Sequence, residues 1–160
     1  MKTINFIFLL FLFTSLYSQD KDEQSINNRP KNGFLLNVGG TDIIGFSLQY
    51  EYNYFLNNNA FLSFGTGVSK SKEIFSNDDI YGVPYHATIN YGKKRLFGEF
   101  GLTGNFYYFG DIEAYPLQLH IGFRFYPLNK NKIYFKIYGI TFFNNEEALI
   151  LPGIHLGFAF

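Results

Sequence analysis

Residues 149–160 read Leu-Ile-Leu-Pro-Gly-Ile-His-Leu-Gly-Phe-Ala-Phe, and this stretch decides how the rest of the chain is interpreted. Successive side chains of an extended strand point to opposite faces. One face of this stretch is apolar throughout and carries Ile150, Pro152, Ile154, Leu156, Phe158 and Phe160. The other face carries Leu151, Gly153, His155, Gly157 and Ala159. The pattern predicts a β-strand with one fully apolar face that ends in an aromatic ring.

The same alternation recurs through the preceding sequence, and a helical period of 3.6 residues does not. Strands are predicted over residues 32–39, 44–56, 60–71, 83–91, 96–106, 115–125, 132–143 and 149–160. Connections after the second, fourth and sixth strands are short. Longer loops follow the third, fifth and seventh strands, over residues 72–82, 110–114 and 144–148, and the first loop, residues 40–43, is brief. The chain is therefore predicted to be all-β, an eight-stranded antiparallel up-and-down transmembrane barrel.

The alternation alone does not say which face points inward. A secreted lipocalin-like barrel would bury the apolar face, whereas a membrane barrel would turn it towards lipid. Roughly forty large side chains lie on the apolar face, but the interior of an eight-stranded barrel is barely wide enough for side chains. The opposite face is rich in Gly, Ser, Thr and Asn, which suit a crowded interior. We therefore expect the apolar face to point outward.

The amino-terminal segment has the layout of a secretory signal peptide. Lys2 precedes an apolar run over residues 4–16, and Ser18 offers a small residue at a cleavage position. The run is shorter than the roughly 20 residues of a transmembrane helix. We predict a signal peptide over residues 1–18, a flexible lead-in over residues 19–31 and a barrel domain over residues 32–160.

The composition is consistent with a membrane barrel and argues against a nucleic-acid-binding protein, a disulfide-rich protein and a protein with a cysteine metal site. The chain has 13 basic and 13 acidic residues, so its net charge indicates no nucleic-acid partner. It contains 21 Phe and 13 Tyr, and rings of this kind are favoured at lipid interfaces. Cysteine is absent, so neither a disulfide framework nor a thiolate metal site is expected.

The predicted interior contains two acids, two bases and all three histidines. We expect Glu51, Glu99, Arg124 and Lys136 to pair and to close the lumen, because an unpaired buried charge is costly. The accompanying polar residues are His86, His120 and His155. A metal or catalytic cluster of histidines is the alternative, but each lies on a different strand and no short motif joins them. We predict no catalytic residue, no metal site and no cofactor.

The longest predicted loop, residues 72–82, is the candidate surface for contact with a partner. Functional contacts concentrate on loops that a rigid scaffold holds. The residues expected to make them are Lys72, Glu73, Asp78, Asp79 and Tyr81. Binding of a divalent ion by Asp78 and Asp79 is the alternative.

Four motifs resemble a group of small outer-membrane β-barrel proteins of Bacteroidetes-type bacteria. They are Val83-Pro84-Tyr85, Gly98-Glu99-Phe100-Gly101, Gly122-Phe123-Arg124-Phe125 and the terminal run over residues 152–160. The size also resembles the eight-stranded barrels of the OmpA and OmpX kind. The resemblance implies an outer-membrane location, contact with outer-membrane lipid, and recognition by the outer-membrane assembly machinery through the strand that ends at Phe160. The terminal strand departs from the usual assembly signal in its glycine positions.

Two enzyme families share this scaffold, and the sequence departs from both. Lipid A deacylases carry a His-x-Ser pair, but here the residues two positions after the histidines are Thr88, Gly122 and Gly157. Palmitoyl transferases of the same membrane carry an amphipathic amino-terminal helix, which residues 19–31 lack. We expect a non-enzymatic surface barrel that binds an extracellular partner or supports the envelope through its loops. The rival hypothesis is a lipid-modifying enzyme that uses His86 and Thr88 at the membrane face.

Overall fold

The computed structural model describes residues 29–39, 45–72, 79–108, 112–114, 117–127, 132–144 and 147–160, and the predicted signal peptide, residues 1–18, lies outside them. The regular structure in these ranges consists of nine β-strands. They are β1 (Asn32–Gly39), β2 (Gly45–Asn57), β3 (Ala60–Lys72), β4 (Asp79–Lys93), β5 (Leu96–Tyr108), β6 (Ile112–Ala114), β7 (Gln118–Phe125), β8 (Ile133–Asn144) and β9 (Glu147–Ala159). Across the described ranges, no helix is long and apolar enough to cross a membrane.

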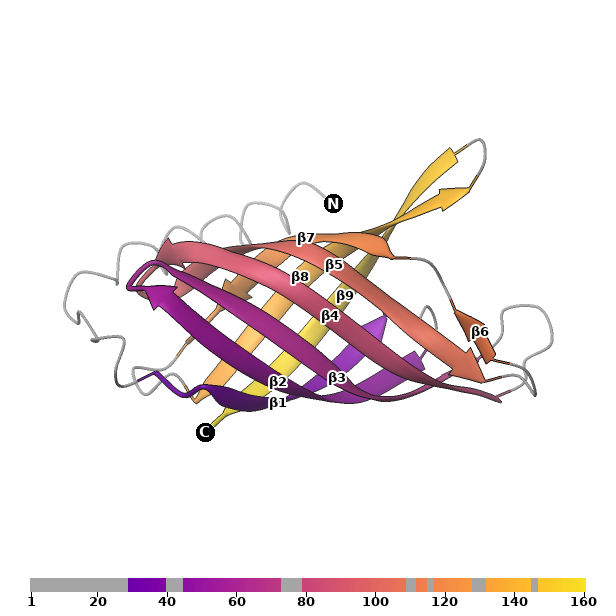
Figure 1. The fold of residues 1–160 in the computed structure, drawn as a ribbon, viewed down its shortest axis with the longest axis horizontal. Coiled ribbons are helices and arrows are strands. Elements are labelled where there is room, and N and C mark those ends of the chain that lie inside the picture. The colour runs from indigo at the N-terminus through magenta and orange to yellow at the C-terminus, as the bar shows by residue number, and fades with distance from the viewer. Residues whose placement is uncertain are drawn as a thin grey trace, which may run out of the picture.

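Eight of the nine strands form a closed antiparallel barrel, as the sequence predicted. The strand order β4-β3-β2-β1-β9-β8-β7-β5 is closed by the pairing of β5 with β4. The short β6 pairs with β5 beyond the end of β7, so it continues the course of β7 along the same neighbour. Figure 1 shows these strands tilted around the barrel axis.

The terminal strand completes the barrel. β9 pairs with β8 on one side and with β1 on the other, from Gly33 opposite Ala159 to Gly39 opposite Gly153. This pairing joins the first and last strands of the sheet. A closed sheet has no edge of unpaired backbone groups, which is the only form of sheet that a hydrocarbon layer tolerates.

The apolar face of the strands points outward, and the polar face fills the interior. Along β2, Leu48, Tyr52 and Leu56 are exposed, whereas Gln49 and Glu51 are buried. Strands β4 and β7 repeat this alternation with the same polarity. The interior is too narrow for the larger set of side chains, which is why volume rather than hydropathy decides the orientation.

The loop boundaries differ from the sequence prediction at one end of the barrel. β3 continues to Lys72 and β4 begins at Asp79, and these two residues are direct cross-strand partners. Residues 112–114 form β6 instead of a loop, and the hairpin of β8 and β9 extends to Asn144 opposite Glu147. This hairpin projects past its neighbours in Figure 1. Alternation is a weak signal where both faces meet water, so the strands extend further than the apolar pattern predicted.

Candidate functional site

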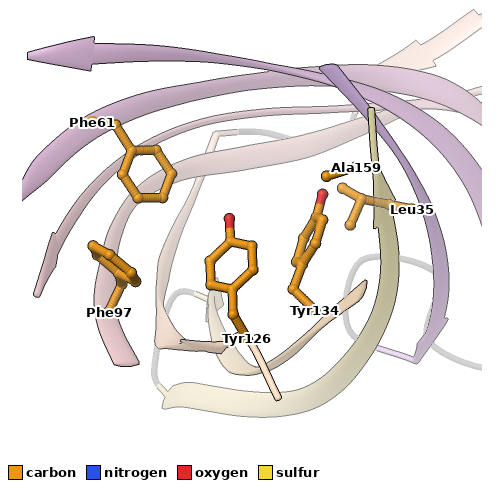
Figure 2. Close-up of a cluster of buried hydrophobic side chains, with 6 residues drawn as sticks. All are labelled: Leu35, Phe61, Phe97, Tyr126, Tyr134 and Ala159. Carbon is orange, nitrogen blue, oxygen red and sulfur yellow. The ribbon is translucent and has the colours of Figure 1, made fainter. Parts of the chain in front are cut away.

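An aromatic layer closes the barrel interior at the end with the tight turns. Figure 2 shows the rings of Phe61, Phe97, Tyr126 and Tyr134 inside the barrel, with Leu35 and Ala159 beside them. The ring centroids are 5.2 Å apart for Phe61 and Phe97, and 5.2 Å apart for Tyr126 and Tyr134. Phe61 and Phe97 are each 1% exposed. The described side chains therefore plug this end with contacts that leave little space for solvent.

Two of the large rings fit inside the barrel because a glycine faces each of them across the sheet. Tyr134 lies opposite Gly157, and Tyr138 lies opposite Gly153. A Cβ at Gly157 would be 2.3 Å from Tyr134 Cζ, and a Cβ at Gly153 would be 2.3 Å from Tyr138 Cζ. The glycines on the inner face of β9 thus provide the volume that the tyrosines of β8 occupy.

The ion network next to the aromatic layer is centred on Glu51. Arg124 donates from Nη1 to Glu51 Oε1 and from Nη2 to Oε2, each at 2.9 Å. Lys136 donates to Oε2 at 2.5 Å, and the Tyr134 hydroxyl donates to Oε1 at 2.8 Å. All four side chains are at most 1% exposed. Two cations and a hydroxyl therefore stabilise this carboxylate where water is scarce.

Glu99 is the second acid of the network and is held by the same two cations. Lys136 donates to Glu99 Oε1 at 3.2 Å, and Arg124 Nε lies 3.5 Å from Oε2. The Thr88 hydroxyl donates to Oε1 at 3.0 Å. Arg124 and Lys136 thus bridge two carboxylates, and the four charges balance one another.

Neighbouring rings and polar groups fix the position of the Arg124 guanidinium. Its Cζ lies 5.0 Å from the centroid of the Phe61 ring and 5.0 Å from that of Tyr134, so aromatic faces flank the cation. Nη1 also donates to Asn53 Oδ1 at 3.1 Å, and Nη2 donates to Ser63 Oγ at 3.0 Å. The network draws its members from β2, β3, β4, β5, β7 and β8, and therefore ties six strands together.

The three histidines are buried in the lumen, but they do not form one site. His86 bridges Gln49 Oε1 and Glu51 Oε2, at 3.0 Å from each. His120 stacks on Tyr138 with ring centroids 4.6 Å apart, and His155 packs against the same ring at 4.6 Å. Both ring nitrogens of His155 are buried without a hydrogen-bond partner in the structure. Across the described residues, no group of three or more His, Cys, Asp or Glu side chains could hold a metal ion.

The geometry does not support the pairing of His86 with Thr88 that a lipid-modifying enzyme would require. Both side chains point into the lumen and not towards the membrane face. The ring nitrogens of His86 contact Gln49 and Glu51, and the Thr88 hydroxyl donates to Glu99. A base that activates a nucleophile must lie within hydrogen-bond reach of it. The local geometry therefore provides structural partners for both residues.

The predicted contact loop is shorter than expected, and three of its five residues lie in strands. Lys72 ends β3, while Asp79 and Tyr81 lie at the start of β4. Glu73 and Asp78 lie outside the described residues. Lys70, which the sequence did not single out, forms an ion pair with Asp79 at 2.6 Å, and its Nζ lies 5.6 Å from the Tyr81 ring centroid. The backbone pairing of Lys72 with Asp79 corrects the predicted range of this loop.

Sequence reasoning did not select the uncharged partners of the ion network. Asn53 and Ser63 are joined by a 2.6 Å hydrogen bond, and Asn90 donates to Ser63 at 3.0 Å. Tyr134 and Tyr126 also contact the network, and each was already on the inner face by alternation. That alternation was the available signal, but it does not say which inner residues lie at the same depth.

These features define a class: a small closed β-barrel with a filled polar interior and an apolar exterior. The fold is similar to that of the Yersinia pestis outer membrane protein Ail in a phospholipid bilayer nanodisc. The TM-score is 0.50 at 11% sequence identity, over 82% of this chain and 100% of that one. A crystal structure of Ail, the attachment invasion locus protein of Yersinia pestis, matches with a TM-score of 0.47 at 15% identity, over 81% and 95% of the two chains. No family model and no curated protein matches the sequence.

Proposed function

We propose that this protein is a non-enzymatic barrel of the bacterial outer membrane that binds a partner or supports the envelope through its loop end. The observation that carries the proposal is an apolar exterior band around the barrel. It runs from Phe46 to Leu56 on β2, and from Ile150 to Phe160 along β9 and the final residue. Each run spans ten residue steps, or roughly 33 Å at about 3.3 Å per residue.

That length matches the apolar thickness of an outer membrane. Strands of such barrels tilt by about 40°, so roughly 33 Å of strand projects onto about 25 Å, the height of the apolar band in outer-membrane barrels. Rings such as Phe46 and Tyr54 are 54% exposed, which a water-soluble barrel would have to cover. A lipocalin-like barrel would also need its apolar face inside, where this chain carries Glu51 and Arg124.

The filled interior supports a binding or supporting role rather than transport. The aromatic layer and the ion network occupy the lumen across its width, and they hold the carboxylates and cations in mutual contact. One surface available for interaction is the rim where β3 meets β4. It includes Lys72, Asp79 and Tyr81, together with residues 73–78 between them. We propose that this rim contacts an extracellular partner.

Two further partners are part of this proposal. Outer-membrane lipid would surround the apolar band, and the assembly machinery would recognise β9 with the exposed ring of Phe160. Recognition of a terminal strand by addition to a sheet edge requires that β9 be accessible before it pairs with β1. Closure of the barrel would then release it.

The location is tested by fractionation and by gel mobility. We expect the protein in the outer-membrane fraction, running at different apparent sizes before and after boiling in detergent. Ala87→Leu, on the outward face of β4, is a control that should preserve both properties. Recovery as a soluble periplasmic species would overturn the proposal and favour the lipocalin-like alternative.

The role is tested by comparing a loop variant with a deletion strain. Because Lys72 and Asp79 are cross-strand partners, replacing residues 73–78 by Asn-Gly should close the hairpin with a two-residue turn. We expect this loop variant to fold as a barrel but to leave the phenotype of the deletion strain unchanged when it is expressed there. Asn58→Gly, in the turn at the opposite end, is the control. Expressed in the deletion strain, this variant should rescue the deletion phenotype as the wild-type protein does. A change in lipid A acylation in the deletion strain, reversed by wild type but not by His86→Ala, would instead establish the enzyme hypothesis.

A further inference from the structure

The described charged side chains at the tight-turn end of the barrel are all basic. Basic side chains lie before β1, at the end of β4 and in the turn that follows it, and before β8. They are Arg29, Lys31, Lys93, Lys94, Arg95 and Lys132, named here the basic rim. Described residues 29–32, 56–60, 92–97, 126–127, 132–133 and 158–160 at this end contain no Asp or Glu.

The connecting segments at the opposite end of the barrel carry acidic residues. The connecting segments there, residues 40–44, 73–78, 109–111 and 145–146, carry Asp42, Glu73, Asp78, Asp111 and Glu146 and no basic residue. Lys70 and Lys72 of β3 lie near these segments, and Asp20, Asp22 and Glu23 precede the described residues. From residue 29 onward, basic residues are in excess at the tight-turn end and acidic residues at the other end, although the whole chain has zero formal charge.

The lumen does not neutralise the basic rim. Its two carboxylates, Glu51 and Glu99, already face Arg124 and Lys136 at the distances given above. At this end the described side chains therefore offer no carboxylate to the exposed Lys93 and Lys132. The rim is a surface that attracts anions.

Arg29 lies over the tight-turn end of the barrel interior, close to Lys94. Its guanidinium Cζ lies 5.1 Å from the centroid of the Phe97 ring, and Arg29 and Lys94 line the same small hollow beside Tyr126. Nε and Nη1 of Arg29 are buried without a hydrogen-bond partner in the structure. Burial lowers the pKa of Arg29, and the charge interaction with Tyr126 acts in the opposite direction.

The apolar exterior ends directly beside the basic rim. Tyr91 is 68% exposed, and Lys93 follows two residues later on the same outer face of β4, about 7 Å further along the strand. An aromatic ring at headgroup depth with a cation just beyond it matches a lipid that has apolar chains and an anionic phosphate. A soluble anion would bind the cations but would not contact the adjoining apolar band.

We propose that the basic rim binds the phosphate headgroups of anionic phospholipids in the leaflet at the tight-turn end, an inference that rests on the membrane location proposed above. Lys93 and Lys132 supply exposed positive charge to these headgroups. Arg29 and Lys94 place two further cations at the mouth. The rim thereby selects anionic lipid and fixes the depth of the barrel in the bilayer.

The test measures which lipid surrounds the purified full-length protein in vesicles of phosphatidylcholine with a minority of phosphatidylglycerol. Spin-labelled forms of the two lipids report the immobilised fraction of each. We expect a preference for phosphatidylglycerol on the order of threefold at low salt, which falls towards one at about 1 M salt, where the screening length is about 3 Å.

Two variants with the same loss of charge locate the binding surface. Lys93→Gln with Lys132→Gln should reduce the preference severalfold, whereas Lys70→Gln with Lys72→Gln at the other end should preserve it. Equal reduction by both variants, or a wild-type preference that salt does not change, would overturn the inference. Failure of the wild-type protein to float with vesicles would refute the membrane location itself, which distinguishes the two failures. Gel mobility before and after boiling confirms that each variant is folded.

Discussion

Arg124 of β7 and Glu51 of β2 form a two-pronged ion pair across the lumen, with both Nη–Oε distances at 2.9 Å. The two residues are 73 positions apart in the chain. Their strands are not neighbours in the barrel, so the ion pair crosses the interior and links strands that share no backbone hydrogen bonds. Lys136 and Glu99 complete the charge balance.

Removing Arg124 should therefore destabilise the barrel strongly. Arg124→Gln leaves two buried carboxylates with one cation, and breaking such a pair typically costs about 3–5 kcal/mol. Urea unfolding in lipid vesicles measures the loss. Asp79→Asn, which removes the exposed ion pair with Lys70, is the control and should leave the free energy of unfolding nearly unchanged. Equal effects of the two substitutions would contradict a structural role for the network.

Gly157→Ala should destabilise the barrel through crowding of the interior. The added methyl would lie 2.3 Å from Tyr134 Cζ, and overpacking of this kind costs about 1–3 kcal/mol. Gly98→Ala is the matched control, because the nearest atom to its added Cβ is the Tyr91 carbonyl oxygen at 3.7 Å. The measurement is the denaturant midpoint of each variant. A Gly157→Ala protein as stable as Gly98→Ala would show that the rings are not tightly held.

The filled lumen should not conduct ions. The aromatic layer of Phe61, Phe97, Tyr126 and Tyr134 closes one end, and the ion network occupies the interior beside it. We expect the purified protein to insert into a planar bilayer without raising its conductance, while a water-filled porin does so in the same apparatus. Steady single-channel currents from the wild-type protein would contradict closure and indicate a small channel.

A charge placed in the middle of the exterior band should disrupt insertion. Ala87 faces outward near the centre of the run from Tyr81 to Tyr91 on β4. Ala87→Arg should cost about 2–4 kcal/mol in a bilayer, the usual cost of a cation at the midplane of a barrel exterior. Ala87→Leu is the matched control and should be tolerated. Identical stability of both variants in lipid would indicate that this face meets water.

Alternation along single strands was enough to predict the architecture. Eight segments with one apolar face indicated a closed antiparallel barrel, which the pairing of β1 with β9 confirms. The same alternation placed Glu51 and Arg124 on the inner face, because side-chain direction in a strand is a local property of the backbone. Interior volume then decided which face was inside. None of these steps required knowledge of how one strand is aligned with another.

Only the tertiary structure decided which inner residues meet. The stagger between strands sets the depth of each side chain. It brings Arg124 to Glu51, while His120 and His155 pack on the Tyr138 ring. It also pairs Lys72 with Asp79, where polar residues on both faces conceal the alternation. The sequence determines on its own which face a residue occupies, because that depends on two adjacent peptide units. Contacts across the lumen depend on the stagger summed around all eight strands, which no single stretch of sequence encodes.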